Sequence, residues 1–159
     1  MVDSRAKGRT AETNAKKELI KLTGLGWERT PLSGALSAKH KLKGDLYVPD
    51  VRIKYCVEVK HYKDDHLTSK ILTNKNPQLQ QWWEQTVRES REIDKEPLLI
   101  FKFDRSKWFA AFSEWDVSVS LEDAHEKFIT IHNLISDKQY GTVYICTLTD
   151  FCAFEEFNE

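Results

Sequence analysis

The chain has 159 residues, of which 40% are hydrophobic and 31% are charged, a composition typical of a globular domain and not of a disordered chain. No apolar stretch approaches the ~18 residues that a membrane span needs, and the polar, charged N-terminus excludes a secretory signal peptide. We therefore expect one domain over residues 1–159, located in the cytoplasm and without a membrane partner.

The net charge of −1 hides two oppositely charged parts of the chain. Residues 1–63 hold 14 Lys/Arg and 7 Asp/Glu, whereas residues 64–159 hold 10 Lys/Arg and 18 Asp/Glu. The basic part favours a polyanionic substrate such as nucleic acid. The alternative is that these charges are simply exposed to solvent on an ordinary protein surface. The acidic residues gather in a C-terminal extension at about 113–159, which we expect to face away from a polyanion.

The first third of the chain predicts a helix followed by short strands. Helical periodicity, turn residues and strand alternation give a helix at 4–23, a strand at 27–30, a basic loop at 31–43, and strands at about 44–48 and 53–60. The last two strands are separated by Pro49-Asp50, a common turn dipeptide. We therefore expect them to form a hairpin.

The rest of the chain predicts a second helix and further strands. This helix starts at Asn76-Pro77 and buries one face that includes Trp82 and Trp83, for which base stacking is the alternative role. The remaining predicted elements are strands at 98–103, 108–112 and 142–147 and helices at 121–128 and 150–157. Helix, strands, helix and strands together indicate the α/β class, a mixed sheet flanked by helices.

Three polar residues on two adjacent strands suggest a catalytic site. The strand at 53–60 alternates apolar and polar side chains, so Glu58 and Lys60 point to the same face, and Asp45 opens the neighbouring strand. Two carboxylates can hold a hard divalent cation such as Mg²⁺, with Mn²⁺ as a substitute, beside a positioned water. A nearby lysine can orient that water and stabilise charge on a phosphate. This chemistry suits hydrolysis of a phosphodiester.

Two neighbouring carboxylates leave alternatives open. Glu12 lies within the apolar arc of the first helix, where a carboxylate is costly unless it is paired. It either pairs with a surface lysine or approaches the metal site. Asp50 competes with Asp45, because Pro49-Asp50 followed by Glu58-Val59-Lys60 is a literal Pro-Asp…Glu-x-Lys string. We favour Asp45, because the apex of a turn would hold Asp50 away from Glu58.

The order of motifs resembles the archaeal-type Holliday-junction resolvases of the PD-(D/E)XK nuclease superfamily. The matching motifs lie within about residues 5–66: Lys7-Gly8-Arg9-Thr10-Ala11-Glu12, Arg29-Thr30-Pro31-Leu32-Ser33-Gly34, Lys43-Gly44-Asp45-Leu46 and Val57-Glu58-Val59-Lys60. The resemblance implies a restriction-endonuclease-like fold, a homodimer, and Mg²⁺-dependent nicking of four-way DNA junctions.

The resemblance also implies roles for single residues. Asp45 and Glu58 would bind the metal, Lys60 would position the water, and Glu12 would be the carboxylate that the helix adds to the site. Ser33 would lie near the scissile phosphate and Arg29 would contact phosphate. A glutamine of the second helix supports the site in some relatives, which makes Gln81 a candidate.

Further DNA contacts are expected from basic residues near these motifs. The candidates are Arg5, Arg9, Lys39, Lys41, Lys43 and His61. Besides junction resolution, three functions remain open: a restriction-like or repair endonuclease acting on linear duplex, a non-catalytic DNA-binding module with the same fold, and a protein–protein interaction module that uses the acidic C-terminal third. A small intracellular resolvase would also fit a virus or a mobile element as its source.

Overall fold

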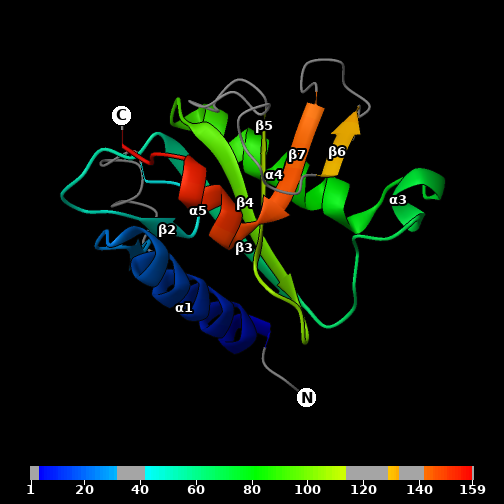
Figure 1. Ribbon diagram of the computed structural model, residues 1–159, viewed down its shortest axis with the longest axis horizontal. Helices are drawn as coiled ribbons and strands as arrows, with labels where there is room; N and C mark the ends of the chain where they lie inside the picture. Colours follow the sequence, from blue (N-terminus) through cyan, green and yellow to red (C-terminus); the bar gives the residue numbers. More distant parts are fainter. Residues whose placement is uncertain (1–3, 32–41, 114–128, 133–141, 159) are drawn as a thin grey trace.

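The computed structural model describes residues 4–31, 42–113, 129–132 and 142–158 (Figure 1). Its elements in chain order are α1 (Ser4–Thr23), β1 (Glu28–Arg29), β2 (Leu46–Tyr47), β3 (Tyr55–Tyr62), α3 (Lys70–Thr73), α4 (Gln78–Glu92), β4 (Glu96–Phe103), β5 (Phe109–Ser113), β6 (Ile129–His132), β7 (Thr142–Thr147) and α5 (Leu148–Phe154). None of the helices in these ranges is long and apolar enough to cross a membrane.

Seven strands form one sheet in the order β1-β2-β3-β4-β5-β7-β6. β3 and β4 run parallel, with Tyr55 opposite Glu96 and Tyr62 opposite Phe103, and the other neighbouring pairs are antiparallel. Parallel neighbours need a crossover connection, which here carries α3 and α4. The mixed sheet flanked by helices confirms the predicted fold class.

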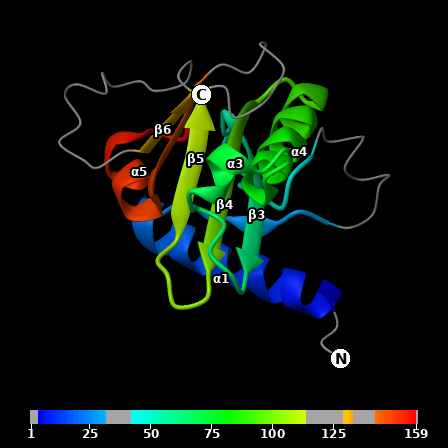
Figure 2. The same cartoon turned by 90° about the vertical axis from the view of Figure 1, so that its right-hand side faces the viewer.

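Helices cover both faces of the sheet (Figure 2). α1 and α5 pack on one face through residues such as Leu19 and Phe151, whereas α4 packs on the other through Trp82 and Trp83. The buried apolar surface on both faces supplies the main driving force for this arrangement. Both tryptophans thus belong to the core, as the helical spacing predicts.

Because helices pack on both faces of the sheet, the face of β3 that was expected to be polar and exposed is buried. The alternating pattern predicts a polar face that includes Cys56 and Glu58. In the structure these two residues are only 2% and 4% exposed, because α4 lies over that face. A strand buried on both sides is the usual state of a parallel pair in a covered sheet. Glu58 is therefore a buried carboxylate.

The described C-terminal part differs from the prediction in the bounds of α5, in the presence of β6 and in the burial of Glu155. The predicted helix at 150–157 is α5, which begins at Leu148 because the Thr147 hydroxyl caps it by accepting a hydrogen bond from the Asp150 N–H. β6 was not predicted, and the helix predicted at 121–128 lies outside the described residues. Glu155 does not add to an acidic surface, because its side chain is buried and pairs with Lys54.

Candidate active site

The backbone of β3 fixes Asp45 just before β2. The Asp45 N–H donates to the Val57 carbonyl at 2.7 Å, and Asp45 Oδ2 accepts from the Val59 N–H at 2.8 Å. The preceding Gly44 has a φ of +76°, and a Cβ at this position would lie 2.5 Å from the Val57 oxygen. Only glycine permits both this backbone conformation and this close approach. The Gly-Asp pair therefore directs a carboxylate toward β3.

Glu58 is held between Lys60 and helix α4. Glu58 Oε1 accepts a hydrogen bond from Gln85 Nε2 at 2.9 Å and lies 3.2 Å from Lys60 Nζ. Gln85 Nε2 also donates to Glu89 Oε1 at 3.1 Å. These contacts fix the carboxylate and the ammonium relative to each other. Because side chains two residues apart on a strand point to the same face, the pattern of β3 produces this pair directly.

Asp45, Glu58 and Lys60 open onto one pocket with a volume of about 330 Å³. The end of β3 forms one wall of the pocket, and the first half of α1 forms another, which includes Lys7 and Glu12. The predicted set of two carboxylates, a lysine and a helix carboxylate is therefore brought together in space.

Burial raises the pKa of both strand carboxyls. The pKa of Glu58 rises to about 8, first because burial disfavours the charged form and then because the charge of Asp45 is close. Burial likewise raises the pKa of Asp45 to about 6, against the opposing effect of the hydrogen bond from the Val59 N–H. A cation between these two neighbouring carboxyls, whose burial disfavours ionisation, would stabilise their charged forms.

The sequence left two alternatives for Glu12, pairing with a basic side chain or approaching the metal site, and its position in the structure allows both. It lines the pocket with Asp45 and Glu58, and its Oε2 also accepts a hydrogen bond from Arg29 Nε at 2.9 Å. Its partner is an arginine of β1 and not a surface lysine. Arg29, which was expected to contact phosphate, therefore has a carboxylate partner in this structure.

The two candidate aspartates are clearly separated by their positions. Asp45 lines the pocket beside Glu58, whereas Asp50 is exposed in the turn between β2 and β3 and does not line that pocket. The antiparallel register pairs Leu46 with Val57, which places Asp45 next to Glu58 across the strands. The geometry thus favours the assignment made from the turn preference of Pro49-Asp50.

The carboxylates of the pocket are compatible with a hard divalent cation that takes few protein ligands. Among the described residues, no three His, Cys, Asp or Glu side chains converge as a complete metal-binding group. Mg²⁺ keeps several waters and is usually bound by one or two carboxylates together with substrate phosphates. The carboxylate oxygens of half-buried Asp45 and buried Glu58 lie in one pocket and fit that requirement.

The other residues expected to contact DNA are spread around this pocket. Arg5 and Arg9 are exposed on α1, and His61 lines the pocket while its Nε2 lies 2.9 Å from Asp104 Oδ1. Lys43 pairs with Glu92 at 2.9 Å. Ser33, Lys39 and Lys41 lie outside the described residues.

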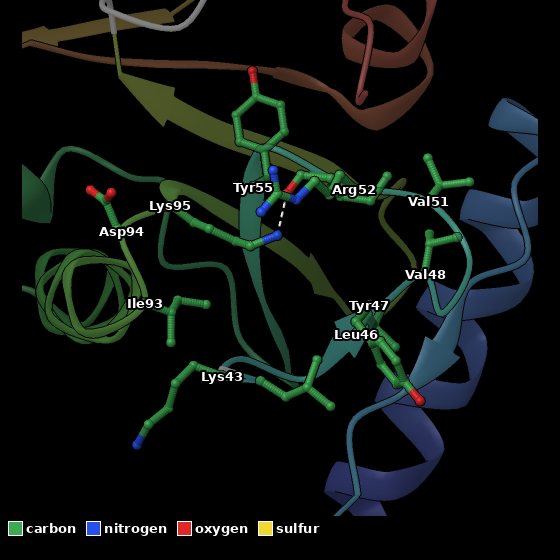
Figure 3. A pocket seen from close by; sticks show the side chains of 12 residues that line it. Lys43, Leu46, Tyr47, Val48, Val51, Arg52, Tyr55, Ile93, Asp94 and Lys95 are labelled. Carbon is green, nitrogen blue, oxygen red and sulfur yellow. Dashed lines mark hydrogen bonds between the residues drawn. The ribbon is translucent and has the colours of Figure 1, made fainter. Parts of the chain in front are cut away.

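Lys43 borders a different hollow, of about 440 Å³, at the start of β3 (Figure 3). There the Lys95 ammonium points inward and donates to the Ile53 carbonyl, while the Lys43 side chain extends away from it. This hollow shares no lining residue with the pocket of Asp45 and Glu58. Lys43 is therefore close to Asp45 in the chain but directed elsewhere.

Sequence reasoning missed one direct contact of the site. Gln81, the glutamine expected to support it, donates to the Asn76 carbonyl, whereas Gln85 touches Glu58. Gln78, Gln81 and Gln85 recur at helical spacings of three and four, which indicated a row of amides. The sequence does not show how this helix is aligned along β3, so it could not predict which of the three glutamines contacts Glu58.

Comparisons with known proteins show which proteins this chain is similar to. Residues 3–159 match the family model described as "Phage putative PDDEXK endonuclease". Protein D14 of Escherichia phage T5 is 44% identical over 121 residues, which cover 74% of this chain and 76% of that protein. The solved structure of Hjc, a Holliday junction resolvase of Archaeoglobus fulgidus, aligns over 94% of this chain and 91% of its own at 16% identity, with a TM-score of 0.43.

The sequence matches alone decide the family, because the family model spans nearly the whole chain and the phage relative is close. The chain belongs to this phage family of PDDEXK endonucleases.

Proposed function

We propose that this chain is a single-domain, Mg²⁺-dependent endonuclease that resolves four-way DNA junctions by paired phosphodiester hydrolysis. The observation that carries the proposal is the pocket in which Asp45, Glu58 and Lys60 meet. The basic N-terminal part of the chain, which lines this pocket through α1, supports a polyanionic substrate.

The chain's own residues would divide the work as follows. Asp45 and Glu58 would hold the ion, with Glu12 as a third carboxylate at the rim. Lys60, 3.2 Å from Glu58, would orient the attacking water and stabilise the charge that grows on the phosphate. Gln85 would keep Glu58 in place by its hydrogen bond. When bound, Mg²⁺ would supply positive charge against the phosphate and lower the pKa of a bound water.

Resolution of a junction would require two such sites. A four-way junction offers two strands related by a two-fold axis, and a symmetric homodimer presents two sites on such an axis. We therefore propose a homodimer acting on branched DNA. Sedimentation of the protein alone and on junction DNA tests this part, and a monomer in both states would contradict it.

A cleavage assay on matched substrates tests the whole proposal. The protein is incubated with a labelled immobile four-way junction and with linear duplexes of the same arm sequences, in Mg²⁺, Mn²⁺ or a chelator. We expect paired nicks in the junction with either metal and none with the chelator. Equal cutting of the duplexes would favour a restriction-like or repair enzyme. Binding without any cutting would favour a non-catalytic module.

A further inference from the structure

A third hollow, distinct from the one that Lys43 borders, adjoins the candidate active site on the side of α4. Its volume is about 440 Å³, and Lys60 and Tyr62 line both this hollow and the candidate active site. This volume falls in the range of roughly 300–1,000 Å³ that is typical of small-molecule sites. A stacked base pair within a duplex is too large for such a space, whereas a single nucleotide is of suitable size.

Tyr62 presents a fixed aromatic ring at this hollow. The residue is 40% exposed, yet its ring lies 4.7 Å from that of Trp82, centroid to centroid, and 5.9 Å from that of His66. Trp82 is itself buried against Phe103. A ring held in place by its neighbours loses little conformational freedom when a base stacks on it, which makes it an effective stacking platform.

The rest of the wall carries groups that recognise nucleotides. Amide side chains can both donate to and accept from the edge of a base, and a guanidinium can contact a phosphate. Such groups line this hollow together with the carboxylate of Glu84: Asn76, Gln78, Gln81 and Arg88. The wall is thus polar and aromatic, which suits a nucleotide better than an apolar ligand.

We propose that this hollow takes one unpaired base of the strand that is cut, stacked on Tyr62. The inference rests on the nuclease function proposed above, because Lys60 joins the hollow to the site where the phosphate would lie. A base can reach Tyr62 only after leaving its own stack, which costs least where pairing is already disturbed. The hollow would therefore favour cutting beside a branch point or an unpaired nucleotide over cutting within a regular duplex.

A double-mutant cycle between protein and DNA tests the stacking contact. The cut is first mapped on a four-way junction in Mg²⁺, and affinities are then measured in chelator so that no strand is cleaved. Abasic sites replace, one at a time, the two nucleotides on each side of the scissile phosphate. Wild type is compared with Tyr62→Leu, with Tyr62→Phe, which keeps the ring, and with Leu72→Ala, an exposed apolar residue outside the hollow.

We expect Tyr62→Leu to weaken binding of the intact junction by about 5- to 150-fold, the range for loss of one stacked base. At one position the abasic site should cost wild type a similar factor, and the two changes together should cost no more than either alone. Tyr62→Phe and Leu72→Ala should bind like wild type.

Two results would overturn the inference while leaving the nuclease proposal intact. In both, wild type cuts the junction: either Tyr62→Leu binds it normally, or the losses from Tyr62→Leu and from the abasic site multiply at every position. A wild-type protein that neither binds nor cuts DNA would overturn the proposed function and the stacking contact together.

Discussion

At the scale of single residues, Asp45 and Glu58 are the pair on which the proposed chemistry depends. Asp45→Asn and Glu58→Gln each keep the shape of the side chain while removing a charged metal ligand. We expect both variants to lose cleavage, because the ion could no longer be held against the phosphate. Junction binding in chelator should persist, and above pH 8, where both carboxyls are ionised in wild type, it should become tighter because fewer negative charges would face the phosphates.

Asp50→Asn is the matched control for this test, because Asp50 is exposed in the turn and lies outside the pocket. It should cut like wild type. An active Asp45→Asn together with an inactive Asp50→Asn would show that the wrong aspartate has been assigned. Cleavage rates and affinities on the same labelled junction provide both measurements.

The raised pKa values of Asp45 and Glu58 predict how pH affects the metal-free protein. Between about pH 4 and pH 8 the folded protein binds more protons at these carboxyls than the unfolded chain does, because the folded pKa values are about 6 and 8. Stability in chelator should therefore fall as pH rises through this range. Glu58→Gln, which carries no ionisable group, should lose less stability over the same range and should melt higher than wild type at pH 8.

Mg²⁺ should reverse this destabilisation, because it binds the deprotonated carboxylates that the folded protein otherwise disfavours. Thermal unfolding with and without Mg²⁺ at pH 5 and pH 8 measures the effect. The rise in Tm with Mg²⁺ should be larger at pH 8 than at pH 5 in wild type, and should be nearly absent in Glu58→Gln. An equal rise in both proteins would place the ion elsewhere.

The sequence predicted these charged residues better than the contacts around them. Strand alternation was enough to put Glu58 and Lys60 on one face, and turn chemistry was enough to place Asp50 in a turn away from the pocket, while the metal-binding role of Asp45 stays a prediction. It could not show that α4 covers that face and buries Glu58, because the docking of a helix on a sheet depends on packing between distant segments. For the same reason Gln85, and the pairing of Arg29 with Glu12, became visible only in the structure.

At the scale of secondary-structure elements, the close approach of β2 to β3 depends on Gly44. Replacing it with alanine would force a strained φ and bring a Cβ within 2.5 Å of a backbone oxygen, which cannot move aside as a side-chain tip can. We expect Gly44→Ala to destabilise the protein by about 1–3 kcal/mol and to displace Asp45 from the pocket.

Gly26→Ala is the control, because a Cβ there would meet no atom within 4 Å. Chemical denaturation of both variants, followed by cleavage assays under folding conditions, separates the two expected effects. If folded Gly44→Ala cuts at the wild-type rate, the position of Asp45 tolerates more freedom than the hydrogen bonds to β3 suggest.

At the scale of the whole molecule, the C-terminal segment closes the core and is more than an acidic appendage. Phe157 lies beyond α5, with its ring centroid 5.3 Å from that of Trp27 and 5.7 Å from that of Tyr55, and Ile53 bridges to Asn158. Together with the ion pair between half-buried Lys54 and buried Glu155, these contacts hold the segment after α5 against the start of β3. Removing Glu155 would therefore disturb the fold, because Lys54 would lose its buried partner.

Glu156, which is exposed, is the better residue for testing whether acidic surface charge in this segment affects DNA binding.

The distribution of charge along α1 gives a final prediction about how DNA is held. The first half of this helix lines the candidate active site, and Arg5 and Arg9 are exposed there, whereas Lys17 and Lys21 are exposed in its second half. If phosphates lie over the site, neutralising Arg5 and Arg9 should release fewer counterions on binding. The slope of log affinity against log salt should then flatten by up to about 2 × 0.9 units.

Neutralising Lys17 and Lys21 is the control, because it removes the same charge from the same helix. It should leave this slope nearly unchanged. An equal effect of the two double variants would mean that DNA binding depends only on the total charge of the protein. The DNA would then not be positioned over the pocket of Asp45 and Glu58.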